Sequence, residues 1–403
     1  MELSFFNSIG LHLGRALLWI VGSGMVLELL MRLWNAFANK FVYSEIRRAS
    51  YLPAGYQDYI KLYDDWTRSI FEYLPVGLRF FNRQSSISGR VINNSIGFRG
   101  PEFRPREPDE LRIVLLGGSA AWSSGASSNE TTIAGWLEKI IRDDGRLLRG
   151  KWKTASVVNL AQIMNYQTQD LIHAALHLPT LQPQFVFSYT GWNEFIASNR
   201  MSEEVIKKFE VYPMEELMGW EPTRAGANRV KILKYALRLT LARYSHVVRF
   251  FVPEMHRSPM GDLLPAPRKI SDNVKLIGPL FCRYLKALEA VCRGNGSRHV
   301  QFLQPTIYRK PNVTSDEQRV LKLYDELRPI HGGMETARFM RNQSIYKYVH
   351  DHTGSPEYGD ICDLYDLFMN DKEDVFQSLV HLTDFGYRRV AQAMYEKLLE
   401  MEK

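Results

Sequence analysis

The chain has 403 residues, of which 45% are hydrophobic and 24% are charged, a composition typical of folded globular proteins. This length allows two or three structural units of about 100 to 200 residues and excludes a small disulfide-stapled fold. Lys and Arg number 51 against 44 Asp and Glu, so the net charge is +7, which is spread too thinly to predict nucleic-acid binding. The three cysteines show no metal-binding spacing.

The N-terminal segment, residues 1–40, contains an apolar stretch. Residues 16–27 (ALLWIVGSGMVL) carry no charge, and Arg15 and Arg32 flank them. The stretch is shorter than the roughly 20 residues of a spanning helix, but Glu28 lies near one end, where a side chain can reach the membrane interface. We therefore predict a membrane-anchor helix within residues 1–40. The alternatives are a buried core helix and a signal peptide.

After this segment, residues 41–105 mix aromatic and polar side chains with Pro and Gly, and they predict a connecting subdomain. From residue 106 onward, short apolar runs alternate with helical spacing. The runs that predict buried parallel strands are residues 113–116, 156–160, 185–189 and 299–303. After the first run, Asn129 is expected to cap a helix whose apolar residues include Ile133, Leu137 and Ile141. The fold class is therefore α/β, a doubly wound parallel sheet of about five strands within residues 106–403.

A helical insertion is expected at about residues 200–273. Between residues 224 and 257 it carries eight Lys or Arg against one acid, Glu254. Lys231, Lys234 and Arg238 are spaced to share one helix face. Such a helix would contact anionic lipid or an acidic polymer, and the alternative is a solvated basic face over an apolar core side.

Polar side chains follow the predicted strands. Ser119 comes after two glycines at the end of the first strand, the segment 159–164 follows the second, and Asn193 follows the third. His381 lies near the C-terminus. In open α/β sheets, sites form at the carboxyl ends of strands. A serine nucleophile needs a base, and the oxyanion needs donors, so these residues predict acyl-transfer chemistry.

These segments resemble the conserved blocks of the SGNH hydrolases, also called the GDSL esterase/lipase family. The resemblance covers about Asn94 to the C-terminus and leaves the insertion unmatched. It rests on four segments in order: NSIGFRG from Asn94, RIVLLGGSAAW from Arg112, GWNEF from Gly191 and HLTDFGYRRVA from His381. It implies a flavodoxin-like three-layer sandwich, with the N-terminal anchor and the insertion added to it.

The resemblance also implies roles for individual residues. Ser119 would be the nucleophile, His381 the general base and Asn193 an oxyanion donor. The backbone N–H groups of Ser119 and Met164 would complete the oxyanion site. No metal ion and no organic cofactor are expected.

Two positions depart from the family pattern. Met164 stands in place of the oxyanion glycine, where a side chain disfavours positive φ and narrows the pocket. Ser378 stands where the family has Asp three residues before the histidine, and a hydroxyl carries no charge to stabilise imidazolium. Asp374, Asp366 or Asp363 would supply the acid from a neighbouring turn, or the site is a Ser–His dyad.

The resemblance implies a membrane-associated serine esterase or O-acyltransferase that acts on an acylated glycan or lipid of the bacterial envelope through an acyl-enzyme on Ser119. The expected location is the inner membrane, on a side that the sequence leaves open. The expected partners are the acylated carbohydrate or lipid substrate, the membrane, and a membrane-bound O-acyltransferase or polysaccharide-export complex, with no nucleic acid. The alternative, motivated by Met164 and Ser378, is a catalytically degenerate SGNH-like subunit that binds a polymer or partner in a membrane complex.

Overall fold

The computed structural model describes residues 19, 21–33, 74–76, 79–81, 86–87, 91–163, 165–198, 270–326 and 344–403. The chain forms two compact units. One comprises residues 1–48 and 218–263, and the other comprises residues 49–217 and 264–403. The predicted basic insertion lies outside the described residues, apart from the first residues of a helix that begins at Ile270.

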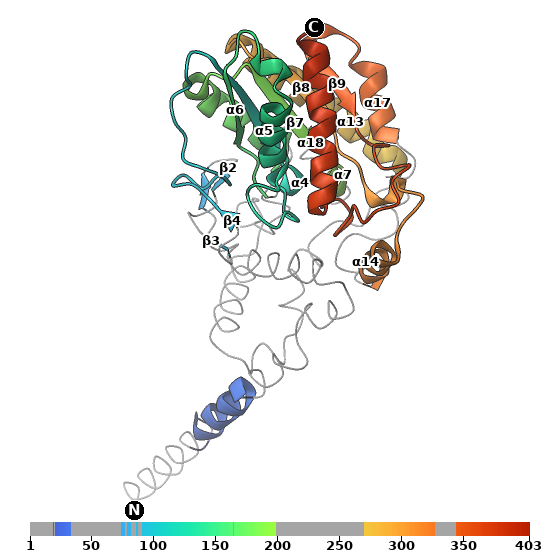
Figure 1. Cartoon of the computed structure of the whole chain (residues 1–403). Helices are drawn as coiled ribbons and strands as arrows, with labels where there is room; N and C mark the ends of the chain where they lie inside the picture. Colours follow the sequence, from blue (N-terminus) through green and yellow to red (C-terminus); the bar gives the residue numbers. More distant parts are fainter. Residues whose placement is uncertain are drawn as a thin grey trace, which may run out of the picture. The chain divides into compact units, whose positions relative to one another are not determined.

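The second unit is built on a parallel sheet of five strands (Figure 1). In spatial order the strands are β6 (Thr154–Asn159), β5 (Glu110–Gly117), β7 (Phe185–Thr190), β8 (Arg298–Leu303) and β9 (Asp360–Asp363). Each neighbouring pair is parallel. Every residue of β5 and β7 is buried, which explains their continuous apolar sequences. The predicted α/β class and parallel sheet are confirmed.

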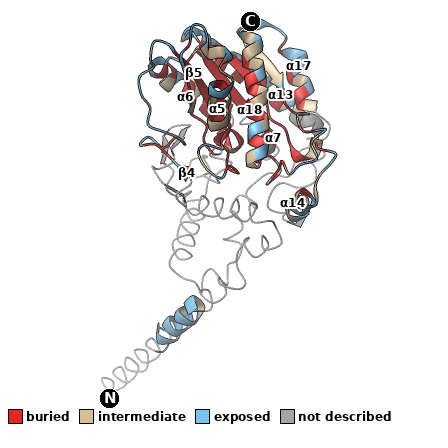
Figure 2. Ribbon diagram, in the orientation of Figure 1, coloured by how far each residue is buried: buried red, intermediate tan, exposed pale blue. Residues whose placement is uncertain are grey.

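Helices cover both faces of this sheet. α5 (Ile133–Asp144) packs against α18 (Asp384–Met401) on one face. α6 (Gln167–Leu181), α13 (Ile270–Gly294) and α17 (Ser344–His352) pack together on the other. Figure 2 shows the strands as a buried layer between helices whose outer faces are exposed. The arrangement is the three-layer sandwich that the sequence predicts, with the carboxyl ends of all five strands at one edge.

Short elements complete the described part of this unit. Two antiparallel pairs precede the main sheet: β1 (Leu74–Val76) with β2 (Arg79–Phe81), and β3 (Ser86–Ile87) with β4 (Val91–Ile92). The remaining helices are α4 (Ser119–Trp122), α7 (Trp192–Ser198), α14 (Ser315–Glu326) and the 3-10 turns η3 (Arg146–Leu148), η5 (Ile307–Arg309) and η6 (Pro356–Tyr358). Both antiparallel pairs fall within the predicted connecting subdomain.

The start of α5 differs from the sequence prediction. Thr132, not Asn129, is the N-cap, and its side chain accepts the Gly135 N–H at 3.0 Å. Asn129 accepts instead from the Arg99 side chain at 3.0 Å. The helix therefore starts later than predicted, because the side-chain oxygen of Asn129 is used by a distant part of the chain.

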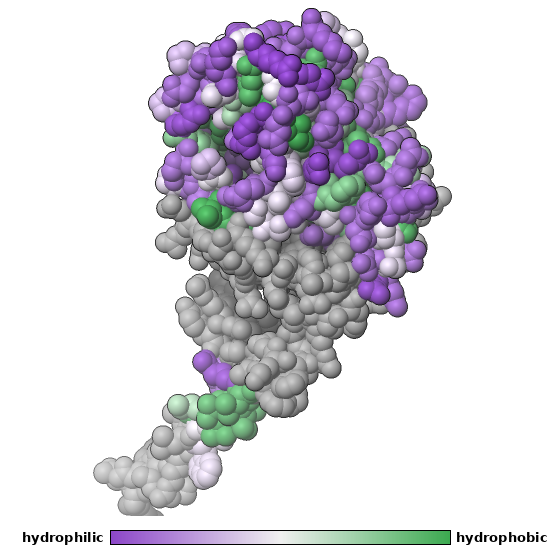
Figure 3. All heavy atoms as spheres, in the orientation of Figure 1, coloured by the Kyte–Doolittle hydropathy of each residue, from purple (hydrophilic) through white to green (hydrophobic). Residues whose placement is uncertain are grey.

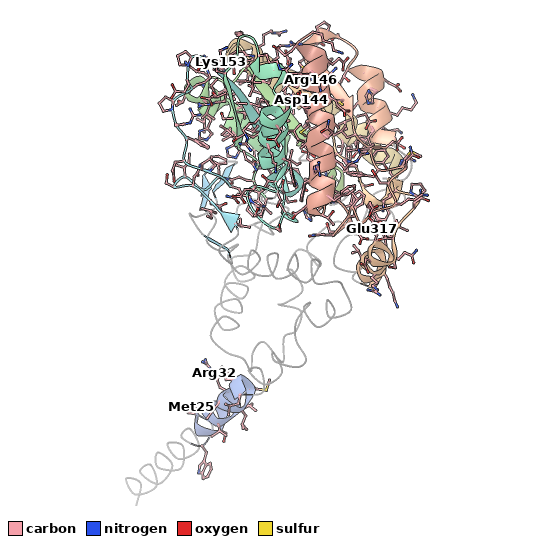
Figure 4. The ribbon with its side chains drawn as sticks, in the orientation of Figure 1. Met25, Arg32, Asp144, Arg146, Lys153 and Glu317 are labelled. Carbon is pink, nitrogen blue, oxygen red and sulfur yellow. The ribbon has the colours of Figure 1, made fainter. Side chains whose placement is uncertain are left out.

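In the first unit, residues 21–33 form a helix with exposed apolar side chains (Figure 3). Trp19 is 77% exposed and Met25 is 69% exposed. Glu28 pairs with Arg32 at 2.9 Å on the same helix, and Figure 4 labels Met25 and Arg32. Among the residues that the structure describes, no helix combines the length and the apolar character that crossing a bilayer requires. The predicted anchor helix is therefore not supported as a spanning segment, and the rest of residues 1–40 lies outside the described part.

Candidate active site

The turn after β5 places a serine at the carboxyl edge of the sheet. β5 ends at Gly117, whose φ is +141°, and α4 begins with Ser119. A Cβ on Gly117 would lie 2.4 Å from the backbone oxygen of Tyr189. A Cβ on Gly118 would lie 2.3 Å from Asn193 Nδ2. Only glycine fits at these two positions, so the Gly-Gly pair lets the turn approach both β7 and Asn193 closely.

Ser119 contacts a histidine of the loop that precedes α18, and that histidine contacts a second serine. Ser119 Oγ lies 2.8 Å from His381 Nε2, and Ser378 Oγ lies 2.8 Å from His381 Nδ1. The Ser378 oxygen also accepts the backbone N–H of His381 at 3.0 Å, which holds the hydroxyl close to its own loop. Side chains from opposite ends of the domain sequence therefore form one hydrogen-bonded row, Ser119–His381–Ser378.

Burial controls the charge of this histidine. His381 is 8% exposed, and burial lowers its pKa to about 4. The imidazole is therefore neutral at pH 7 and can accept the proton of Ser119. A hydroxyl at Nδ1 can accept the ring N–H but cannot stabilise imidazolium by charge, as a carboxylate would.

The three aspartates predicted as alternative acids contact other groups. Their partners are Thr314 for Asp374, Arg309 for Asp366 and His350 for Asp363. The Arg309–Asp366 ion pair measures 2.6 Å, and Asp363 lies 3.4 Å from the His350 ring. The structure thus brings Ser378, and not one of these aspartates, to the second nitrogen of His381.

Asn193 lies against the turn that carries Ser119. Its Nδ2 donates to the Asn165 backbone oxygen at 2.8 Å. An amide nitrogen has two hydrogens, so the second can donate to an oxyanion. Met164, the other predicted backbone donor, lies outside the described residues.

Arg99, in the GFRG segment, holds the loop that follows Ser119. Arg99 is 2% exposed, and its guanidinium donates to the backbone oxygens of Trp122, Ser123, Ala126 and Ser128 and to the side chain of Asn129. It also lies 4.6 Å from the centroid of the Trp122 ring. Burial lowers its pKa to about 10, so it stays charged at neutral pH. The sequence analysis singled out the GFRG segment, but it did not predict that the arginine of this segment binds the loop after Ser119.

The loop that carries His381 is held by a buried ion pair. Lys310 and Glu317 contact each other, and both side chains are 0% exposed. Glu317 Oε1 accepts the backbone N–H groups of Val375 at 2.9 Å and Phe376 at 3.1 Å, just before Ser378. Figure 4 labels Glu317 on α14. This contact was missed, although Thr314 and Glu317 have the spacing of a helix capping box.

A second Ser–His pair lies inside the domain. Ser188 Oγ on β7 is 2.9 Å from His299 Nε2 on β8, and Glu289 Oε2 on α13 is 3.7 Å from His299 Nδ1. Ser188 is 0% exposed and His299 is 2% exposed. Burial lowers the pKa of His299 to about 3. This pair was not predicted, because neither residue follows the end of a strand.

Metal ligands do not gather at either pair. Within the described ranges, no group of three or more His, Cys, Asp or Glu side chains is arranged to hold a metal ion.

No family model and no curated protein matches this chain. In contrast, 43 chains of solved structures match its fold. They include an acetyl xylan esterase, AlAXEase (11% identity, 71% of this chain and 98% of the other, TM-score 0.35), and a lipase/acylhydrolase from Enterococcus faecalis (10%, 71% and 94%, TM-score 0.38). The lipase Lip_vut3 from a goat rumen metagenome matches at 11% identity, with 71% and 96% coverage and a TM-score of 0.35.

The chemistry of this chain follows from its own side-chain geometry. Ser119, Asn193 and His381 lie together at the carboxyl edge of the parallel sheet, as the sequence resemblance to the SGNH hydrolases implies.

Proposed function

We propose that this protein is a serine ester hydrolase or O-acyltransferase that forms an acyl-enzyme on Ser119. The observation that carries the proposal is the 2.8 Å contact between Ser119 Oγ and His381 Nε2, beside the Asn193 amide. Ser119 is half-buried, so an ester can reach it from the carboxyl edge of the sheet.

The reaction follows from these positions. His381 Nε2 accepts the proton of Ser119 while Oγ bonds to the ester carbonyl carbon. The negative charge that forms on the carbonyl oxygen is stabilised by the Asn193 side chain and the Ser119 backbone N–H. The tetrahedral intermediate then expels the alcohol, which takes the proton from His381. Water or an acceptor hydroxyl attacks the acyl-enzyme by the same steps in reverse.

We further propose that the substrate is an acylated glycan or lipid and that the protein works at the inner membrane of a bacterial envelope. The exposed apolar side chains of residues 21–33 support contact with lipid. A membrane-bound O-acyltransferase or a polysaccharide-export complex is the proposed partner. Deleting residues 1–36 should abolish co-flotation with vesicles of zwitterionic lipid, which do not attract the basic segment 224–257 by charge, while the α/β domain stays folded. Unchanged flotation would contradict lipid contact through residues 1–36.

A non-catalytic SGNH-like subunit is the second candidate. The hydroxyl at His381 Nδ1 favours it, because the imidazolium lacks the charge stabilisation that a carboxylate at this position would provide.

Reaction with a fluorophosphonate probe separates the two functions. The full chain should form one adduct, on Ser119, and Ser119→Ala should remove it. Ser188→Ala is the matched control, because Ser188 also contacts a histidine but is fully buried, and the adduct should persist. An adduct on another residue, or none in the wild-type chain, would exclude the proposed enzyme and leave the non-catalytic subunit.

A further inference from the structure

Two buried carboxyl groups lie behind the candidate active site. Asp170 on α6 is 0% exposed, and Glu194 on α7 is 1% exposed. The reaction described above uses neither. A buried carboxyl group is retained at low cost only where it is hydrogen-bonded or protonated. We call Asp170 and Glu194 the acidic brace.

Glu194 joins two segments of the site. Its Oε1 accepts the backbone N–H of Gln167 at 3.0 Å, and its Oε2 accepts that of Gly191 at 3.0 Å. Gln167 begins α6, three residues after the predicted oxyanion segment 159–164 ends, and Gly191 follows β7 two residues before Asn193. An ionised carboxylate has two acceptor oxygens and no donor, so the Glu194 side chain can accept both backbone N–H groups at once.

Asp170 lies on the same side of the site as Asn165. Its Oδ1 lies 3.5 Å from Asn165 Nδ2. Asn165 in turn accepts the Asn193 amide on its backbone oxygen at 2.8 Å. Asp170 is therefore linked to Asn193 through one intermediate residue.

The two groups differ in charge. Burial, and then the nearby Glu194, raises the pKa of Asp170 well above its usual range. Burial raises the pKa of Glu194 to about 7, and the backbone N–H groups of Glu194 itself, Gly191 and Gln167 oppose that shift. Two adjacent buried carboxyl groups do not both ionise. Glu194 is therefore the member that loses its proton more readily, and Asp170 is the neutral acid.

On the basis of the proposed function, we propose that Asp170 and Glu194 are positioning residues that hold the Asn193 amide beside the Ser119 turn in the geometry for oxyanion stabilisation. Neither residue touches the ester. They act through Gln167, Gly191 and Asn165, which set where the amide lies relative to the nucleophile. The brace therefore affects the transition state more than substrate binding.

The test uses the full chain with p-nitrophenyl acetate as the ester. In Glu194→Gln, the side-chain NH₂ faces one of the two backbone N–H groups that the carboxylate accepts. We expect kcat to fall about tenfold to a hundredfold, as for small misplacements of catalytic groups, with KM within about twofold of wild type. Hydrogen exchange should become faster in peptides that cover residues 165–170 and 188–195. Glu289→Gln, a buried carboxyl on α13 outside the site, is the control and should change none of these values.

A second pair of variants does not depend on the folding of Glu194→Gln. Asp170→Ala removes the contact to Asn165 and should lower kcat at least about tenfold. Asp170→Asn resembles the neutral acid and should recover most of that loss, which a purely space-filling role would not require.

The proposal is overturned by wild-type kcat and wild-type exchange in Glu194→Gln, by equal losses in Glu289→Gln, or by wild-type kcat in Asp170→Ala. If the wild-type chain hydrolyses no ester, the proposed function fails but the brace remains measurable. Faster exchange of both peptides in Glu194→Gln alone would then still support the brace, and unchanged exchange would overturn it.

Discussion

The two Ser–His pairs of the α/β domain differ in their surroundings. Ser119 and His381 meet at the carboxyl edge of the sheet, where the group at the second ring nitrogen is a hydroxyl. Ser188 and His299 meet inside the sheet, where a glutamate lies 3.7 Å from the second nitrogen. The buried pair has the residue types of a complete triad, and the edge pair does not. The edge pair, however, is accessible to a substrate and lies beside an oxyanion donor.

Access and oxyanion donors account for this difference. Ser119 is half-buried and lies beside the Asn193 amide, whereas Ser188 is 0% exposed. Burial lowers the pKa of both histidines, to about 4 for His381 and about 3 for His299, so both are neutral bases at pH 7. The comparison teaches that a triad is recognised by its position and its donors, and not by composition alone.

The largest expected effect comes from the two histidines. His381→Gln should lower ester turnover by about 10⁴-fold or more, because loss of the base leaves Ser119 protonated. His299→Gln should lower the free energy of unfolding and leave kcat within about threefold. Turnover and urea unfolding, measured for both variants, check the comparison. Equal losses of turnover would mean that the buried pair also supports the chemistry.

The second-largest effect is expected from loss of the Asn193 side chain, the proposed oxyanion donor. Asn193→Ala should slow ester turnover by about 10²- to 10³-fold, the usual loss for one oxyanion donor, while the rate of probe labelling falls less. Steady-state kinetics at saturating ester measures this loss. Unchanged turnover would show that the Asn193 amide only binds the Asn165 backbone oxygen.

Placing a carboxylate beside His381 should have a smaller effect on turnover, and in the opposite direction. Ser378→Asp should raise turnover at least about tenfold near neutral pH, because a carboxylate at Nδ1 stabilises imidazolium. It should also raise the pKa of His381 above about 4, so the acid limb of the pH–rate profile should move to higher pH. A profile unchanged in height and position would show that Nδ1 does not govern the base.

The smallest expected effect is the pH dependence that His299 gives to the free energy of unfolding. His299 stays neutral in the folded protein down to about pH 3, but it binds a proton below about 6.5 in the unfolded chain. The contribution of neutral His299 to the free energy of unfolding is therefore complete above pH 6.5, and it is lost as the pH falls toward 3. The stability difference between wild type and His299→Gln should shrink by up to about 1.4 kcal/mol per pH unit below 6.5. Urea unfolding at pH 7, 6 and 5 measures it, and a constant difference would contradict the burial of a neutral His299.

Local sequence patterns predicted four of the five strands of the main sheet. β5, β6, β7 and β8 are short apolar runs between turn residues, as buried parallel strands require. β9 was not placed, because its sequence DICD is short and polar at an edge of the sheet. The late start of α5 was missed for a different reason, since Arg99 competes for the Asn129 side chain.

The sequence by itself determined the class of fold and the candidate residues Ser119, Asn193 and His381, because strand-end positions and local motifs depend on neighbouring residues. Only the tertiary structure decided which group meets His381 Nδ1 and how the buried carboxyl groups of Asp170 and Glu194 join the start of α6 to the turn after β7. It also decided that a second Ser–His pair is buried inside the sheet. Those contacts join residues far apart in the chain. Their distances and burial depend on how the helices pack on the sheet, which no local pattern encodes.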